Sequence, residues 1–211
     1  MEKIEEFNDY ALEELRKLNN TSEISNPLLV SPESKGKIMY IGQETNGWFE
    51  SLKGSNYSAR QLEEFYARYF LNEKVRNTLF WKFIKDVISS DDLASKIVWT
   101  NALIVGKDKG VGCPRVNSEI KELSVKNLIM IYEYFGIEKI ICAAGPCNPY
   151  YDIYTTFLKE IGKNIDDYPR NGNPIAYSDS EDAIYINHPQ YLWRKSLYYD
   201  VLDKTKEFIR K

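Results

Sequence analysis

The chain has 211 residues, with 28 basic and 31 acidic side chains, a net charge of −3 and a hydrophobic fraction of 43%. This composition is typical of one domain with a real core and excludes a disordered or collagen-like chain. No apolar run approaches the roughly 18 residues of a membrane-spanning helix, and the acidic start predicts no signal peptide. The net negative charge disfavours a protein that coats nucleic acid but allows a local basic patch.

Cysteine and histidine are scarce, which restricts the chemistry that the chain can carry. Cys113, Cys142 and Cys147 form no C-x-x-C pair, which favours a cytoplasmic protein with reduced thiols and no disulfide framework. We expect all three to be small buried residues rather than metal ligands, and we expect no metal and no cofactor. His188 is the only histidine, so a catalytic triad or a zinc site has few ways to form.

The N-terminal part predicts a helix, a loop and a strand. Apolar residues at helical spacing indicate an amphipathic helix over 2–19, and a polar loop with two prolines follows. The segment 37–42 is a short apolar run that ends in glycine, which is typical of a buried strand. A polar stretch at 43–58 then leads to two expected helices, near 59–70 and 74–89.

The remainder of the chain alternates apolar strand patterns with helical patterns. The expected strands are 97–100, 139–144 and 183–187, and the expected helices run over about 117–135, 149–161 and 193–210. Such alternation indicates crossover units and a parallel sheet covered on both faces. We therefore expect an α/β fold, a three-layer α/β/α sandwich with a central four-stranded parallel sheet. It forms a single domain over 1–211, with the helix and loop of 1–36 packed on it.

Polar side chains follow the predicted strands at the edge where open parallel sheets bind ligands. Glu44 follows the first strand, Asn101 the second and His188 the last. Each residue alone also has an ordinary structural explanation, as a solvated acid, a turn-forming amide or a hydrogen-bonded histidine. Dinucleotide-binding, Walker and nucleophile-elbow motifs are absent from the sequence, so the sheet edge has to be interpreted from these residues themselves.

Four segments at these strand ends resemble the uracil-DNA glycosylase superfamily. They are GQETNGW at 42–48, IVWTNAL at 97–103, GIEKIICAAG at 136–145 and HPQYL at 188–192. The first is similar to the family's GQDPY motif and the last to its HPSPL motif. The resemblance covers about residues 37–196 but is specific only at these segments. It implies a four-stranded parallel sheet between helices and hydrolysis of an N-glycosidic bond in DNA.

The resemblance also implies roles, and the chemistry of base removal agrees with them. A flipped nucleotide needs a carboxylate that orients water and faces an oxocarbenium-like sugar, which is the expected role of Glu44. His188 would donate to the carbonyl of the leaving base, and Asn101 would read the donor–acceptor edge of the base. The backbone N–H of Gln43 would add a further contact to the base.

Other residues would line the base pocket or hold the DNA. Trp48 and Phe49, together with Tyr57, are candidates for stacking on the base, although core packing is the better explanation for any two of them. Leu192 matches the family's wedge residue, with core packing as the alternative. The expected phosphate-binding residues are Arg194, Lys195, Lys107, Lys109 and Arg115.

The departures from the family pattern leave the substrate open. The acid is Glu44 rather than Asp, and Asn46, a candidate base-binding residue, stands where the uracil-specific branch has a Tyr that blocks 5-substituted pyrimidines. The N-terminal cysteines of the iron–sulfur branch are absent, which predicts no cluster. We expect a monomeric DNA glycosylase for uracil or a related modified pyrimidine. The alternatives are a catalytically altered DNA- or nucleotide-binding member of the fold and a hydrolase of free nucleosides or nucleotides.

Overall fold

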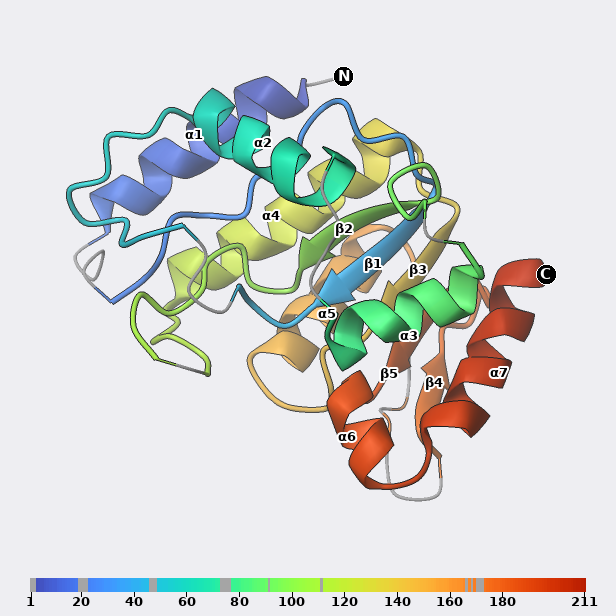
Figure 1. Cartoon of the computed structure of the whole chain (residues 1–211). Helices are drawn as coiled ribbons and strands as arrows, with labels where there is room; N and C mark the ends of the chain where they lie inside the picture. Colours follow the sequence, from blue (N-terminus) through green and yellow to red (C-terminus); the bar gives the residue numbers. More distant parts are fainter. Residues whose placement is uncertain are drawn as a thin grey trace.

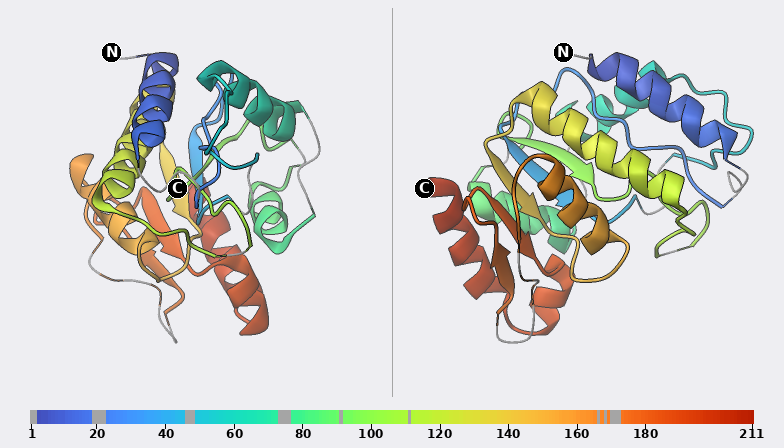
Figure 2. Two further views of the ribbon diagram at one scale, coloured as in Figure 1. Left: turned by 90° about the vertical axis from the view of Figure 1, so that its left-hand side faces the viewer. Right: turned by 180° about the vertical axis from the view of Figure 1, so that it is seen from behind.

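The computed structural model describes residues 3–18, 23–45, 49–72, 77–90, 92–110, 112–165, 167, 169 and 173–211. In this part of the chain, a five-stranded sheet lies between two layers of helices (Figure 1, Figure 2). The strands are β1 Ile38–Gly42, β2 Ile97–Asn101, β3 Lys139–Cys142, β4 Ile175–Tyr177 and β5 Ala183–Ile186. Their order in the sheet is β2-β1-β3-β5-β4.

The α/β class is confirmed, whereas the expected count of four strands is corrected to five. The four predicted strands are the parallel part of the sheet, and β4 is an additional edge strand that pairs antiparallel with β5. β4 has only three residues and reaches β5 through a short turn, so its pattern carries too little periodicity to stand out in the sequence.

The helices of the described residues cover both faces of the sheet. They are α1 Ile4–Lys17, α2 Ala59–Tyr66, α3 Leu79–Ile88, α4 Ser118–Phe135, α5 Tyr150–Glu160, α6 Pro189–Arg194 and α7 Tyr198–Arg210. The segment Ala67–Asn72 continues α2 as a π-helix. The helices α1, α4 and α5 cover one face, and α2, α3 and α7 cover the other (Figure 2). None of the described helices is both long and apolar enough to cross a bilayer.

Local capping explains where several helices begin and end. Asn117 accepts a hydrogen bond from the N–H of Ile120 at 3.0 Å and begins α4, and Gly136 ends it in the left-handed region, as the sequence predicts. Thr78 caps α3, which therefore starts later than the expected residue 74; residues 73–76 lie outside the described part. The predicted helix 193–210 is instead two helices, α6 and α7, and Ser196 lies between them at a φ of 57°.

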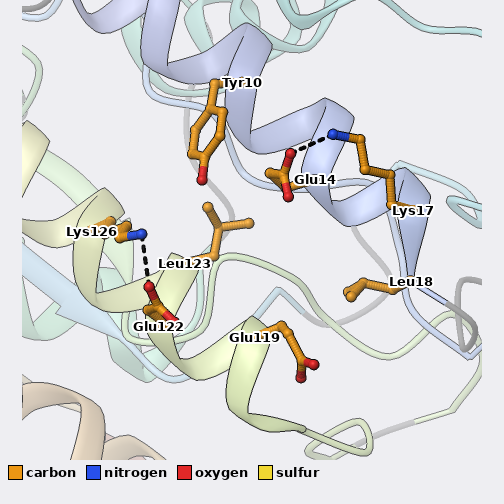
Figure 3. A pocket seen from close by; sticks show the side chains of 8 residues that line it. All are labelled: Tyr10, Glu14, Lys17, Leu18, Glu119, Glu122, Leu123 and Lys126. Atoms are coloured by element: carbon orange, nitrogen blue, oxygen red, sulfur yellow. Dashed lines mark hydrogen bonds and ion pairs between the residues drawn. The ribbon is translucent and has the colours of Figure 1, made fainter.

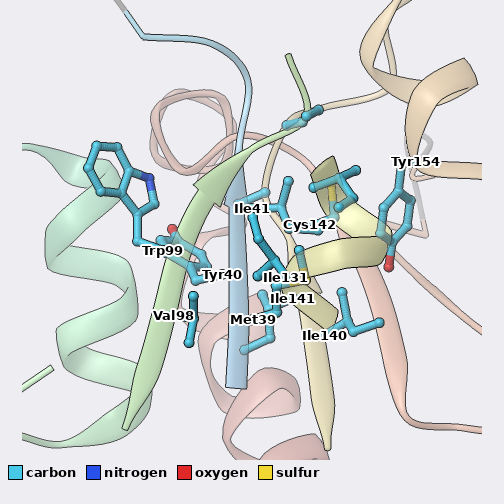
Figure 4. Packing of buried hydrophobic residues seen from close by; sticks show 14 of the residues in the cluster. Met39, Tyr40, Ile41, Val98, Trp99, Ile131, Ile140, Ile141, Cys142 and Tyr154 are labelled. Atoms are coloured by element: carbon cyan, nitrogen blue, oxygen red, sulfur yellow. The ribbon is translucent and has the colours of Figure 1, made fainter. Parts of the chain in front are cut away.

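The core is built on the central strands, whose side chains are almost all buried. Figure 4 shows residues of β1, β2 and β3 packed together with residues from neighbouring helices. On the α2 side, the buried hydroxyl of Tyr66 donates to the carbonyl of Trp99 at 2.9 Å. The N-terminal segment is tied to the same core, because the N–H of Leu28 donates to the carbonyl of Ile104 at 2.8 Å. A single continuous core therefore fixes the carboxyl ends of the strands relative to one another.

Candidate active site at the carboxyl edge of the sheet

The strand order places the predicted polar residues along one edge of the sheet. Asn101 ends β2 beside Gly42 of β1, while Gly145 follows β3 and His188 follows β5. Neighbouring strands lie about 4.8 Å apart, so the edge from β2 to β5 spans roughly 14 Å. The candidate residues after β1, β2, β3 and β5 therefore lie along one continuous edge of the sheet.

Glu44 lies just beyond β1 in a half-buried position. The hydroxyl of Tyr150, at the start of α5, donates a hydrogen bond to Oε2 of Glu44. Burial raises the pKa of Glu44, and the hydrogen bond from Tyr150 partly opposes that rise. The pKa of Tyr150 is itself raised by burial and by the neighbouring carboxylate. The pair fixes the orientation of the carboxylate and leaves Oε1 for another partner.

Two thiols lie near this pair, and they correct the expectation that all three cysteines are buried. Cys142 is buried in β3, whereas Cys113 and Cys147 are exposed, and all three are free thiols. Cys113 and Cys147 are still partly shielded from water, which raises the pKa of both thiols, and the Tyr150 hydroxyl beside Cys113 acts in the opposite direction. Both thiols are therefore protonated near neutral pH. Within the described residues, no cluster of His, Cys, Asp or Glu side chains could hold a metal ion.

Asn101 is a buried carboxamide at the end of β2, with 4% of its surface exposed. In the amide orientation that satisfies it, Nδ2 donates to the Thr100 carbonyl and Oδ1 accepts from the Thr45 N–H, both at 3.2 Å. A carboxamide has two N–H groups and two acceptor lone pairs, so one donor and one acceptor remain for a ligand. A Cβ on Gly42 would lie 2.4 Å from the amide atom that is Nδ2 in this orientation, so only glycine leaves room for this amide.

His188 is held as a neutral imidazole with a defined tautomer. Its Nδ1 accepts a hydrogen bond from the N–H of Gln190 at 3.2 Å, capping α6. Burial, with a smaller effect of Arg194, lowers the pKa of His188 to about 4. Because Nδ1 is an acceptor in a neutral ring, the proton resides on Nε2, which can donate one hydrogen bond to a ligand.

Phe80 joins the two sides of the site, although no sequence pattern indicates it. Its ring stacks on His188 with a centroid distance of 6.1 Å and an interplanar angle of 17°. The Phe80 ring also stacks on Tyr40 at 4.5 Å, and a Cβ added to Gly42 would lie 3.1 Å from the Phe80 Cζ. The half-buried Phe80 ring is thus adjacent to His188 and, at the position of Gly42, close to the Asn101 amide.

Gln43 and Gly145 complete the edge between the acid and the histidine. The Gln43 side chain donates to the Ala144 carbonyl at 2.6 Å and links the loops after β1 and β3. Gly145 has a φ of 75°, which favours glycine, and its carbonyl accepts a hydrogen bond from the Tyr185 hydroxyl. A Cβ on Gly145 would lie 3.5 Å from the His188 nitrogen and 3.9 Å from Gln43 Nε2, so these three residues are neighbours.

Several other predicted site residues have different placements. Asn46 and Trp48 lie outside the described residues. Phe49 belongs to an aromatic cluster, with ring centroids 4.6 Å from Tyr57 and 3.9 Å from Phe65. Leu192 has 0% of its surface exposed, so the wedge assignment is wrong for this structure and the core alternative holds.

The predicted basic residues all lie at the surface, in two groups. Exposed side chains are seen at Lys107, Lys109, Arg115, Arg194 and Lys195. The first three follow β2 and the last two belong to α6 or follow it, so the two groups flank the carboxyl edge of the sheet from opposite ends.

A separate groove lies between α1 and α4 and has a volume of about 210 Å³ (Figure 3). Four of its charged side chains form two pairs, Lys17 with Glu14 at 2.6 Å and Lys126 with Glu122 at 2.8 Å. None of the predicted site residues lines it. The groove is therefore distinct from the carboxyl edge of the sheet.

Comparison with known proteins adds no family assignment. The chain matches no protein-family model, and no curated protein is significantly similar to it. The functional interpretation accordingly depends on the site geometry and on the motif resemblance alone.

Proposed function

We propose that the chain is a monofunctional DNA glycosylase that removes uracil or a related modified pyrimidine. The observation that carries the proposal is the placement of Glu44, Asn101 and His188 along one sheet edge, with Phe80 between the last two. The carboxylate, the amide and the neutral imidazole are the three groups that hydrolysis of a flipped nucleotide needs. A monomer in the cytoplasm, acting on DNA, is part of the proposal.

In the proposed reaction, the bond between C1′ of the sugar and N1 of the base breaks, and its electron pair goes to the base. His188 Nε2–H donates to the base carbonyl on which negative charge develops. Oε1 of Glu44, the oxygen that Tyr150 does not use, orients the water that adds to C1′ and faces the positive charge on the sugar. The water proton passes to the carboxylate and then to solvent. The base leaves as its N1 anion and takes up a proton from solvent, so the products are the free base and an abasic sugar.

Recognition of the base would fall to Asn101 and Phe80. The unused donor and acceptor of the Asn101 amide match the paired acceptor and donor on the edge of a pyrimidine. The Phe80 ring provides a stacking surface between that amide and His188. Since Asn46 stands where the uracil-specific branch has its blocking Tyr, the proposal includes pyrimidines with a substituent at C5.

The test is base release from oligonucleotides. The protein is incubated with single- and double-stranded DNA containing uracil or one of a panel of modified pyrimidines, and free bases are identified by mass spectrometry. Alkaline treatment then reveals abasic sites as strand breaks. We expect release of at least one base by the wild type and a loss of two or more orders of magnitude in Glu44→Gln. The matched control is Glu50→Gln, since Glu50 is an exposed acid of the same loop.

His188 needs a control that separates chemistry from helix capping. His188→Ser keeps an oxygen that can accept from the N–H of Gln190, but it is too short to reach a base. We expect this variant to fold and to lose base release. DNA binding without release of any base would contradict the proposal and favour the catalytically altered alternative. Release from free nucleosides but not from DNA would favour the nucleoside hydrolase.

A further inference from the structure

Two large aromatic side chains are exposed side by side at the junction of α6 and α7. Trp193 is 48% exposed and Tyr199 is 63% exposed, and their ring centroids lie 6.3 Å apart. The other strongly exposed aromatics of the described residues, Tyr10 and Tyr177, are on α1 and β4. Exposed apolar residues that occur singly need no explanation, whereas a contacting pair marks a candidate interaction surface.

The two exposed rings pack against a buried side chain. Tyr198 is buried beneath it, with its ring 5.5 Å from Trp193 and 5.4 Å from Tyr199, both edge-on. The Tyr198 ring also packs edge-on against Phe83 at 5.5 Å, and its hydroxyl donates to Asp86 at 3.1 Å. Tyr198 thus connects the two exposed rings to α3. Binding through rings that are already held costs little conformational entropy.

Uncompensated positive charge lies beside the rings. Arg194 and Lys195 follow Trp193 directly and are exposed, and the described part of the chain offers neither of them an ion pair. The nearby lysines are already paired, Lys82 with Asp86 at 2.5 Å and Lys204 with Asp200 at 3.0 Å. We call Trp193, Arg194, Lys195 and Tyr199 the α6–α7 platform. Its two rings can stack on bases, and its two cations can contact phosphates.

The platform lies close to the candidate site because His188 is the N-cap of α6. Trp193 is five residues further along, and at 1.5 Å per residue its Cα lies roughly 7.5 Å along the helix axis from His188. Consecutive nucleotides of a stacked strand are about 3.4 Å apart, so this distance corresponds to about two nucleotides. Figure 1 shows α6 directly after β5, packed beside α3 and α7.

We infer that the α6–α7 platform binds the unpaired bases next to the extruded nucleotide and gives the protein a preference for single-stranded DNA. In a duplex the faces of the bases are stacked on each other, so exposed rings gain nothing without unstacking them. An unpaired strand offers free base faces and phosphates at once. That the partner is DNA rests on the proposed function. The evidence for a stacking surface is independent of it, namely the exposure and contact of Trp193 and Tyr199.

The experiment measures binding to a labelled oligothymidylate, alone and as a duplex, by fluorescence anisotropy at fixed low salt. The oligonucleotide contains no uracil and is checked by mass spectrometry to remain intact. We expect tighter binding of the single strand by the wild type. Trp193→Ala should weaken this binding by roughly 5- to 150-fold, the range given by loss of one stacked base. Tyr199→Ala should act in the same direction, and duplex binding should change little.

Matched controls separate the platform from general surface effects. Tyr10→Ala and Tyr177→Ala remove aromatics of similar exposure, 42% and 45%, and should leave binding unchanged. Trp193→Phe keeps a ring and should recover most of the affinity, and circular dichroism checks that every variant is folded. Equal single-strand binding by Trp193→Ala and the wild type would overturn the inference, as would wild-type failure to bind the single strand. Self-association through the same rings, detected by sedimentation without DNA and lost in Trp193→Ala, would also overturn it.

The inference and the proposed function fail in different ways. If Trp193→Ala releases a base and binds single-stranded DNA as tightly as the wild type, the glycosylase proposal stands and the inference about the α6–α7 platform is wrong. Platform-dependent single-strand binding with no base released from any substrate would keep the platform and remove the glycosylase.

Discussion

Glu44 is the residue at which the chemistry of the site and the stability of the fold oppose each other. Burial raises its pKa in the folded state above the unfolded value, so ionisation of this carboxyl disfavours folding. Below the unfolded pKa the acid is protonated in both states and the effect vanishes; above the folded pKa it is fully present. We therefore expect Glu44→Gln to raise Tm at pH 7 and to change it little near pH 4.

Thermal unfolding of the wild type, Glu44→Gln and the exposed control Glu50→Gln at both pH values measures this effect. A Tm of Glu44→Gln equal to or below that of the wild type at pH 7 would mean that the carboxylate is well solvated. The same variant is expected to lose base release, so one substitution would raise stability while removing activity.

The hydrogen bond from Tyr150 favours the ionised form of Glu44, which makes Tyr150 a positioning residue with a measurable pH signature. Its hydrogen bond lowers the pKa of Glu44 against the effect of burial. Tyr150→Phe should therefore move the acid limb of base release to higher pH. His188, with a pKa near 4, stays neutral through the range above pH 5 and should contribute no limb there.

The pH profile of base release in the wild type and Tyr150→Phe measures this shift, and an acid limb at the same pH in both would remove Tyr150 from this role.

Glu44, Asn101 and His188 could be predicted as site residues because each lies just after a predicted strand. Tyr150 could not be predicted, because its partner Glu44 is 106 residues away. Phe80 could not be predicted either, because it lies inside a helical pattern typical of ordinary core packing. Contacts between distant segments leave no periodic trace in a single sequence.

At the scale of elements, the short helix α6 links the site to the core through Leu192. This side chain is completely buried, whereas its neighbours Trp193 and Arg194 are exposed. Leu192→Ala should therefore lower the free energy of unfolding by about 2–5 kcal/mol, as expected for a leucine removed from a packed core. Denaturant unfolding measures the change, with Gln190→Ala, an exposed residue of the same helix, as the control.

A stable Leu192→Ala variant with impaired DNA binding would restore the wedge assignment that the burial contradicts. The error in the sequence interpretation has a physical origin. The motif places Leu192 after His188, but which face of a six-residue helix meets the core depends on packing against α3 and α7. The same limit applies to β4, since three residues at a sheet edge give no alternation to detect. The long elements with clear periodicity and caps, such as α4, were predictable.

At the scale of the whole molecule, a net charge of −3 has to be reconciled with a DNA substrate. Net charge controls the long-range field, whereas binding depends on the few cations that touch phosphates. Topology brings two exposed basic groups to the two ends of the carboxyl edge, although the sequence separates Lys107 from Arg194 by most of the second half of the chain. Composition could exclude a general nucleic-acid coat but could not locate this local charge.

The salt dependence of single-strand binding tests that local charge. Each phosphate neutralised on a single strand contributes about −0.7 to the slope of log K against log salt. Replacing both Arg194 and Lys195 by Ala should therefore make the slope shallower by about 1.4, that is, 2 × 0.7. The control replaces Lys35 and Lys96 by Ala, since these exposed lysines precede β1 and β2 at the opposite edge of the sheet and should leave the slope unchanged. Equal slopes for both double variants would mean that binding follows overall charge rather than the carboxyl edge.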